Sequence, residues 1–450
     1  MSAIGRDDDP AVATIAGMSA SPPKMSPGSG GPLPTPESWL PKEHNLYRPR
    51  HGKRQRTALT CALVFFLTPA LLLASGVRAE PFENRPLHGF PSLGDGWAFF
   101  PELSGWAIDQ LPLRKAGVDA ADGISTGVFG DPPGAANGPR NGSVGIPGAN
   151  VPKGPQAYPQ VLAGNDGWLY LGEDVHTRCE PVLDIDHVIA ALNRLRQAVE
   201  ASGRRFELVF APDKSSEEPS HLPDSYVGKE CAPQKTAEFW NRVPAATRAL
   251  DLRPPLAAAE QRLGRSMYDP HDTHWTFDGG LTMTYAIAQA ITPGITATWD
   301  AKPDGFKPWP ADLERLLGRT VDRHLPAYAL SPDGRADRAR YIASDFKTPL
   351  RLVQTDAVPP AGTVRPNLAV VADSFTQFAE PFLAATCKDL TIVHTDTVAE
   401  GDPASLGDLF RDRDVVTFEF VERNVIGGSS ALLRDQSIDK LARVLAQNPR

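Results

Sequence analysis

A run of 21 residues without a charged side chain, TALTCALVFFLTPALLLASGV from Thr57 to Val77, sets the first constraint on this 450-residue chain. As a helix, a run of this length matches the roughly 30 Å of a hydrocarbon core, so it is long enough to span a bilayer. The basic stretch YRPRHGKRQR comes directly before it. Because basic flanks stay in the cytoplasm, everything after Arg78 is expected on the other side of the membrane, held by one pass.

The segments on either side of this run give the expected domain organisation. Residues 1–56 have too few large apolar side chains to offset the entropy of ordering them, so a disordered cytoplasmic tail is predicted. Residues 57–78 are predicted to be an uncleaved transmembrane signal anchor. The alternative is a removed signal peptide, because VRA before Glu80 is typical of a cleavage site. Residues 79–155 are predicted to be an extended Pro/Gly-rich connector, and residues 156–450 a folded domain.

The last segment alternates strands with helices. FELVFA at 206–211, LAVVA at 368–372, LTIVH at 390–394 and VVTFEFV at 415–421 are predicted strands. Continuous apolar runs such as LAVVA are typical of strands buried on both faces of a parallel sheet. The alternation predicts a layered α/β domain with a mostly parallel sheet, and chemistry is expected in the loops after the carboxyl ends of the strands.

Composition contributes two further expectations. The net charge is -8 at pH 7 and no basic stripe with interleaved aromatics is present, which argues against a nucleic-acid partner. Cys179 and Cys231 lie in polar, loop-like sequence and are disulfide candidates in an oxidising compartment, where a bridge would contribute roughly 4 kcal/mol; the alternative is that neither pairs. Cys387 follows a helical segment and is expected to be a buried free thiol.

Two short stretches carry the candidate chemistry. In LAVVADSFTQF a buried strand ends at Ala372, so the hydroxyl of Ser374 is expected at the active edge of the sheet; a plain helix cap is the alternative. In YDPHDTHWTFDGG, residues two apart in an extended loop point to the same side. Asp272 is therefore placed to accept the Nδ1–H of His274, whose Nε2 is left to act as the base for a serine.

The same loop leaves two other interpretations open. Asp269, His271, Asp272 and His274 are dense enough to supply three ligands to a metal ion. The other is a polar loop whose histidine only caps a helix. Spacing alone does not separate these interpretations from catalysis.

Five stretches occur along the chain in a fixed order: GNDGWLYL, FAPDKSS with LP shortly after, DTHW followed by a helix near DGG, VVADSF and FEFVERN. As an ordered set, they resemble the SGNH-hydrolase-like family of alginate and exopolysaccharide O-acetyltransferases, the AlgJ/AlgX-like proteins, over about residues 155–425. ENRPLHGFPSL resembles the segment that follows the membrane anchor of that family. The resemblance implies an SGNH-like fold in which Ser374 is the nucleophile, His274 the general base and Asp272 its orienting acid.

The resemblance also implies a reaction and its partners. An acetyl group would pass through an ester on Ser374 to hydroxyls of an exopolysaccharide acceptor, without a cofactor or a metal. A multi-spanning membrane O-acyltransferase would deliver the acetyl groups. Two alternatives remain, a carbohydrate acetylesterase with the same triad and a non-catalytic polysaccharide-binding scaffold. Ala372 is the hint of a scaffold, because it replaces the usual glycine of the family and alanine does not adopt a positive φ cheaply.

Other residues in the stretches that resemble the family have candidate roles, and some of them have an alternative interpretation. Trp275 is either a wall that stacks on a sugar ring or a buried aromatic. Lys214 is either a contact to an acidic polysaccharide or a solvated lysine. Arg423 is a candidate substrate contact, and an ion pair between Glu422 and Arg423 is expected to shape the pocket floor. The two glycines of DGG are expected to permit close approach of a helix to the sheet.

Overall fold

The computed structural model describes residues 53–79, 89–112, 158–319, 321–342 and 344–450, with a few single positions at 41, 43–44, 116–117, 120 and 124. Contacts divide the chain into two compact units, Met1–Leu71 and Leu72–Arg450. Most of the predicted disordered tail and much of the predicted connector lie outside the described residues.

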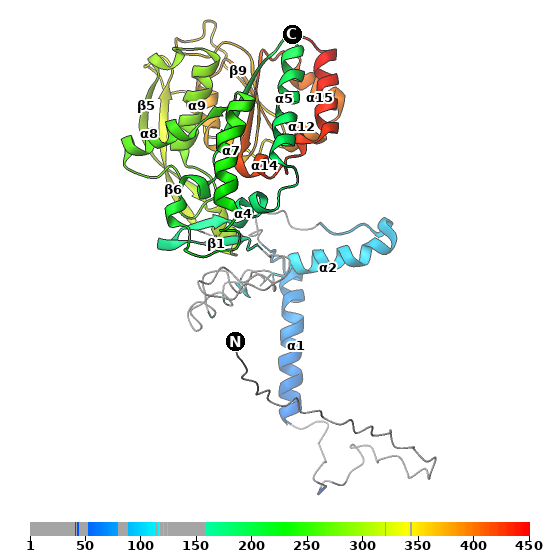
Figure 1. Ribbon diagram of the computed structural model, residues 1–450. Helices are drawn as coiled ribbons and strands as arrows, with labels where there is room; N and C mark the ends of the chain where they lie inside the picture. The colour runs from blue at the N-terminus through cyan, green and yellow to red at the C-terminus, as the bar shows by residue number, and fades with distance from the viewer. Residues whose placement is uncertain are drawn as a thin grey trace, which may run out of the picture. The chain divides into compact units, whose positions relative to one another are not determined.

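The predicted membrane anchor is helical. Helix α1 spans Lys53–Ala74 without interruption (blue in Figure 1). By length and composition, its stretch Arg56–Ala74 is apolar and long enough to cross a membrane. The helix therefore fits a single-pass anchor.

Part of the segment predicted to be an extended connector is helical instead. Leu93–Ala98 forms a 3-10 helix, and α2 follows at Phe99–Asp109. Aromatic side chains contact one another here, with the rings of Phe90 and Trp106 5.0 Å apart. The scattered aromatics of this stretch thus belong to a local helical cluster.

The centre of the second unit is a sheet of six strands in the order β4-β3-β10-β8-β9-β7. Neighbouring strands run parallel except at one edge, where β7 is antiparallel to β9. This confirms the predicted mostly parallel α/β sheet (Figure 1). The strands are β3 (Arg205–Ala211), β4 (Leu250–Asp251), β7 (Leu350–Val353), β8 (Leu368–Ala372), β9 (Asp389–His394) and β10 (Val415–Val421).

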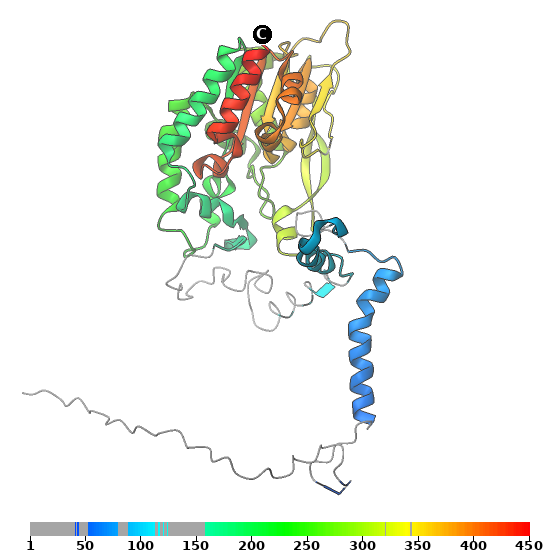
Figure 2. The same ribbon diagram turned by 90° about the vertical axis from the view of Figure 1, so that its right-hand side faces the viewer.

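Helices cover both faces of this sheet. Along β8, Val370 packs into one apolar cluster and Val371 into the other, as the alternation of side chains in a strand requires. Figure 2 shows α15 in red beside α5 in green on one face. That face carries α5 (Ile185–Ala201), α7 (Ala232–Thr247), α12 (Thr395–Glu400), α13 (Pro403–Phe410), α14 (Glu422–Ile426) and α15 (Asp435–Gln447). The other carries α8 (Arg253–Leu263), α9 (Phe277–Ile291) and α11 (Glu380–Thr386).

Two antiparallel hairpins flank the sheet. The first joins β1 (Val161–Ala163) to β2 (Leu169–Leu171), and its turn contains Asp166 and Gly167 at positive φ, as GNDG predicts. The second, from β5 (Asp300–Pro310) to β6 (Asp322–Ser331), is long and encloses the short helix α10 (Asp312–Leu316). Helices α4 (Gly172–Cys179) and α6 (Lys214–Glu217) complete the described elements used below.

The two candidate cysteines form a disulfide. Cys179 ends α4 and Cys231 directly precedes α7, and the structure joins them across a separation of 52 residues. Cys387 is buried and free, as predicted. The bridge fastens α4 to α7, on the face of the sheet that α7 covers.

Removing this bridge should lower stability. In the Cys179→Ser/Cys231→Ser double variant, the unfolded chain regains the freedom of a closed loop of 52 residues, which is worth about 4 kcal/mol. The measurement is the free energy of unfolding in urea, in detergent and under oxidising conditions. Cys61→Ser is the control because this exposed thiol is unpaired. Equal stability of the double variant and the wild type would contradict the prediction.

Candidate functional site

Three adjacent strands end at one edge of the sheet and bring polar side chains together. Lys214 follows β3, Ser374 follows β8, and Arg423 follows β10, which lies between those two strands. Because parallel strands share one carboxyl edge, residues more than 200 positions apart meet there. The candidate site is at this edge, where the alternating pattern predicts it.

Ser374 begins a 3-10 turn directly after β8. The cap of this turn is Asp373, whose Oδ1 accepts the N–H of Phe375 at 3.0 Å. The hydroxyl of Ser374 is therefore not used for capping. It lies 2.7 Å from Nε2 of His274 instead.

His274 is held between Ser374 and Asp272. Its Nδ1 lies 2.7 Å from Oδ1 of Asp272, which also accepts the backbone N–H of His274 at 2.9 Å. The imidazole rests against the rings of Phe375 and Phe378, with centroids 4.9 Å and 5.5 Å away. With Nδ1–H donating to the carboxylate, Nε2 is free to accept the serine proton. The spacing argument thus places these three side chains as predicted.

The charges of this relay reinforce one another. Burial favours the neutral imidazole, but the charge of Asp272 outweighs it and raises the pKa of His274. Burial alone would raise the pKa of Asp272, whereas the charge and hydrogen bonds of His274 lower it overall. The histidine is therefore a stronger base than a free imidazole, and its orienting carboxylate stays ionised at neutral pH.

Lys214 supports the loop that carries the base. Its Nζ donates to the carbonyl oxygens of Asp269, Pro270 and Asp272, at 3.1, 3.2 and 2.6 Å. The side chain is completely buried, and burial lowers the pKa of Lys214 to about 8. Neither predicted role fits this position, because a buried ammonium bound to three carbonyls neither reaches a polysaccharide nor lies in solvent.

Trp275 is buried rather than a sugar platform. No part of it is exposed, and its Nε1 donates to the carbonyl of Phe375 at 3.0 Å. This bond ties the base loop to the turn of the nucleophile. The following glycines allow close packing of α9, but against the turn of the nucleophile rather than the predicted sheet, since a Cβ on Gly280 would lie 2.0 Å from the carbonyl oxygen of Phe378.

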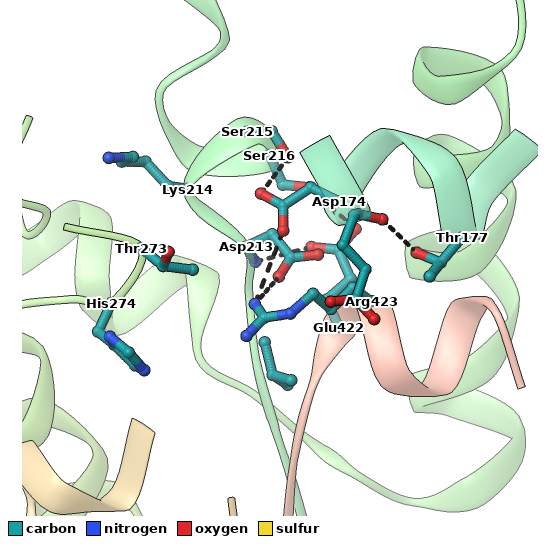
Figure 3. A network of polar contacts seen from close by, with 12 residues as sticks. Asp174, Thr177, Asp213, Lys214, Ser215, Ser216, Thr273, His274, Glu422 and Arg423 are labelled. Carbon is teal, nitrogen blue, oxygen red and sulfur yellow. Dashed lines mark hydrogen bonds and ion pairs between the residues drawn. The ribbon is translucent and has the colours of Figure 1, made fainter. Parts of the chain in front are cut away.

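Arg423 does not pair with Glu422, so that expectation is wrong. Its Nη1 donates to Asp213 at 2.8 Å and lies 3.6 Å from Asp174 (Figure 3). Glu422 binds the buried Arg178 instead, at 3.0 Å. The two neighbours separate because each meets an opposite charge from another element. Glu422 meets Arg178 of α4, and Arg423 meets Asp213, the second residue after β3.

The relay opens into a cleft of about 1300 Å³. Arg423, one of the predicted substrate contacts, lines this cleft and therefore faces the space beside Ser374. Other lining residues come from α4, β5 and α10: Glu173, His176, Trp309, Arg315 and Leu316.

Sequence reasoning missed one carboxylate at this site. Asp312, at the start of α10, has its Oδ2 3.6 Å from Nδ1 of His274 and lines the cleft. Nothing in PADLERL marks this residue, because its proximity to His274 depends on the fold of the long hairpin.

The predicted metal ligands do not converge. Asp269 and His271 turn away from the relay and pair with an arginine and a glutamate. Within the described parts of the chain, Asp272, His274 and Asp312 are close enough to surround an ion. However, Nδ1 and Oδ1 lie 2.7 Å apart, which fits a hydrogen bond better than two ligands on one tetrahedral ion, roughly 3.4 Å apart.

Ala372 fits its place without strain. It is the last residue of β8, pairs with His394 and is fully buried. It is not among the described non-glycine residues with positive φ. Alanine therefore supplies the backbone that this position needs.

Comparisons with known proteins agree with the fold. Residues 161–329 match the family model for the SGNH hydrolase-like domain of acetyltransferase AlgX, a range that includes Asp272 and His274 but ends before Ser374. The probable alginate O-acetylase AlgJ of Pseudomonas fluorescens is 29% identical over 215 residues, 44% of this chain and 54% of that protein. The one from Pseudomonas syringae pv. tomato is 26% identical over 169 residues, 36% and 42%. The chain thus spans about half the length of these relatives.

Among solved structures, the chain is similar to the O-acetyltransferase domain of Pseudomonas putida AlgJ. The TM-score is 0.41 at 17% sequence identity, over 63% of this chain and 98% of that one.

Replacing the buried lysine should destabilise the domain. Lys214→Met leaves three buried carbonyl groups without their shared donor, and we expect the free energy of unfolding to fall by about 2 kcal/mol or more. Urea unfolding measures the loss. Lys235→Met is the control, because Lys235 is half exposed and forms a surface pair with Glu238. Equal effects of the two substitutions would show that Lys214 does not stabilise the loop.

Proposed function

We propose that this chain transfers acetyl groups to hydroxyls of an exopolysaccharide, because residues 161–329 match the SGNH hydrolase-like domain of acetyltransferase AlgX and the two relatives are probable alginate O-acetylases. The observation that carries the proposal is the relay of Asp272, His274 and Ser374, with 2.7 Å at each step. The relay lines an open cleft, so a substrate can reach the serine hydroxyl.

The first half of the reaction acetylates the serine. Nε2 of His274 takes the proton of Ser374 as Oγ attacks the carbonyl carbon of an acetyl donor. The resulting imidazolium is stabilised by Asp272 and returns the proton to the leaving group. Arg423 lines the same cleft, so its guanidinium is placed to contact substrate oxygen atoms.

The second half transfers the acetyl group. A sugar hydroxyl gives its proton to His274 and attacks the acetyl carbon, and Ser374 leaves with the proton that His274 returns. The two halves use the same base, which needs no cofactor. The acceptor in this proposal is an exopolysaccharide of the alginate type, in line with the names of the two Pseudomonas relatives.

In this proposal, the acetyl donor is a partner protein in the same membrane. Helix α1 would anchor the chain by a single pass of the inner membrane, with the relay on the periplasmic side. One helix does not carry acetyl groups across a bilayer. A multi-spanning membrane O-acyltransferase is therefore the partner that we propose to acetylate Ser374.

One observation favours hydrolysis as a second candidate activity. The cleft beside Ser374 has a volume of about 1300 Å³, which admits water together with a small acyl donor. Water attacking the acetyl-serine would make the chain a carbohydrate acetylesterase with the same relay. The products formed with and without a polysaccharide distinguish the two activities.

The acetyl-serine intermediate is directly testable. Incubation with an activated acetyl ester should add one acetyl group to the wild type and none to Ser374→Ala or His274→Ala, as read by intact-mass spectrometry. Ser344→Ala is the matched control, because Ser344 is a second serine of the same cleft and should not accept the group. A wild type that neither gains the acetyl group nor consumes the ester would leave only a non-catalytic scaffold.

The pH dependence of acetylation should follow His274. The base works when neutral, and its pKa is raised, so the rate should fall as pH drops through a single ionisation above about 6.5. Asp272→Asn removes the charge that raises this pKa. Its profile should move to lower pH, while the maximal rate falls by roughly three to four orders of magnitude, by analogy with the serine-protease triad. Stopped-flow rates of ester cleavage give both profiles; an unshifted midpoint in Asp272→Asn would exclude His274 as the ionising group.

A further inference from the structure

The mechanism leaves one segment without a role, the β5–α10–β6 hairpin that spans 300–331. It contacts the base loop, residues 269–274, at several points. The inference drawn from it rests on the proposed function, because it concerns how the base of that reaction is held.

Asp312 and the base loop exchange two hydrogen bonds, each from a backbone N–H to a carboxylate oxygen. The N–H of Asp312 donates to Oδ2 of Asp272 at 3.1 Å, and the N–H of Thr273 donates to Oδ1 of Asp312 at 2.7 Å. Asp272 therefore uses one oxygen for His274 and the other for the hairpin. The carboxylate that orients the base is itself oriented by α10.

Two more contacts join the same pair of segments. Nδ1 of His271 lies 2.6 Å from Oε1 of Glu314, and Nε of Arg323 donates to Oδ2 of Asp269 at 3.0 Å. Asp269 and His271, which the sequence offers as metal ligands, thus attach the base loop to the hairpin.

The hairpin also places charge next to the base. Oδ2 of Asp312 lies 3.6 Å from Nδ1 of His274. The other ionisable groups that face the imidazole are Asp272 from its own loop and Arg423 from α14, while Ser374 faces Nε2. Burial and the charge of Asp272 raise the pKa of Asp312, and the negative charge of Asp312 in turn contributes to the raised pKa of His274.

The same hairpin forms a wall of the cleft. Trp309 and Pro310 of β5 line it just before Asp312, and Arg315 and Leu316 of α10 line it just after. A substrate that contacts this wall therefore contacts the element that holds the base loop.

We propose that Asp312 is a positioning residue for His274, through which the hairpin wall of the cleft fixes the base loop in its working geometry. Asp312 acts through Asp272 and Thr273 and does not exchange protons with the substrate.

The test compares Asp312→Ala and Asp312→Asn in the full chain in detergent. Asparagine keeps an oxygen for the N–H of Thr273, whereas alanine does not. We expect Asp312→Ala to lower the rate of Ser374 acetylation roughly 10- to 100-fold through misplacement of the base, and Asp312→Asn to recover most of that rate. Both variants remove a negative charge, so the pKa of His274 measured by NMR titration should fall in both.

The control is Asp322→Asn, an exposed acid of the same hairpin that lies outside the cleft; it should leave both readouts at wild-type values. The proposal is overturned if Asp312→Ala keeps the wild-type rate and the wild-type pKa of His274, or if Asp322→Asn produces the same losses. Failure of the proposed function would give a different result, namely a wild type that is never acetylated. The pKa of His274 can still be measured in that protein, and an unchanged pKa in both Asp312 variants would then decide against the role of Asp312.

Discussion

The buried ammonium of Lys214 is the interaction on which the site depends. It follows β3, the strand beside β10 in the central sheet, and binds three carbonyl groups of the loop at 269–272. Without a cation there, the loop would bury these carbonyls unpaired, at a cost of about 1–3 kcal/mol each. Burial lowers the pKa of Lys214 only to about 8, so the side chain is largely charged at neutral pH. The sheet thus fixes the loop, and the loop fixes His274.

The buried charges next to the site are balanced by opposite charges in direct contact with them. Asp174, Asp213 and Glu422 are buried against the guanidiniums of Arg178 and Arg423. Burial raises the pKa of Asp174 and of Asp213, which reduces the excess of negative charge. Buried clusters of ion pairs contribute little to stability, but they fix the orientation of the side chains that form them. Arg423 is held on one side by two carboxylates and faces the cleft with the rest of its guanidinium.

The sequence predicted the strands from their apolar runs, the contact of Asp272 with His274 from their spacing, and Ser374 and the two cysteines from residue types outside the helices and strands. The buried strands, the relay of Asp272, His274 and Ser374, and the pairing of Cys179 with Cys231 all agree with the structure. The burial of Lys214 and the proximity of Asp312 were missed, because both depend on which loop lies over which strand end. The expected Glu422–Arg423 pair failed for the same reason: residues adjacent in sequence found stronger partners on other elements.

Ala372 shows how the turn of the nucleophile is held without the family's glycine. Asp373 accepts the N–H groups of Phe375 and Val421, which ties the turn to β10. Glu419, buried within β10, accepts from the N–H of Asp373 and the hydroxyl of Thr376. Burial and the neighbouring Asp373 raise the pKa of Glu419, so these carboxyls do not oppose each other as two full charges. Because Glu419 and the N–H of Val421 in β10 hold the turn, the residue before Asp373 needs only extended backbone. Alanine at this position is therefore no evidence of a lost activity.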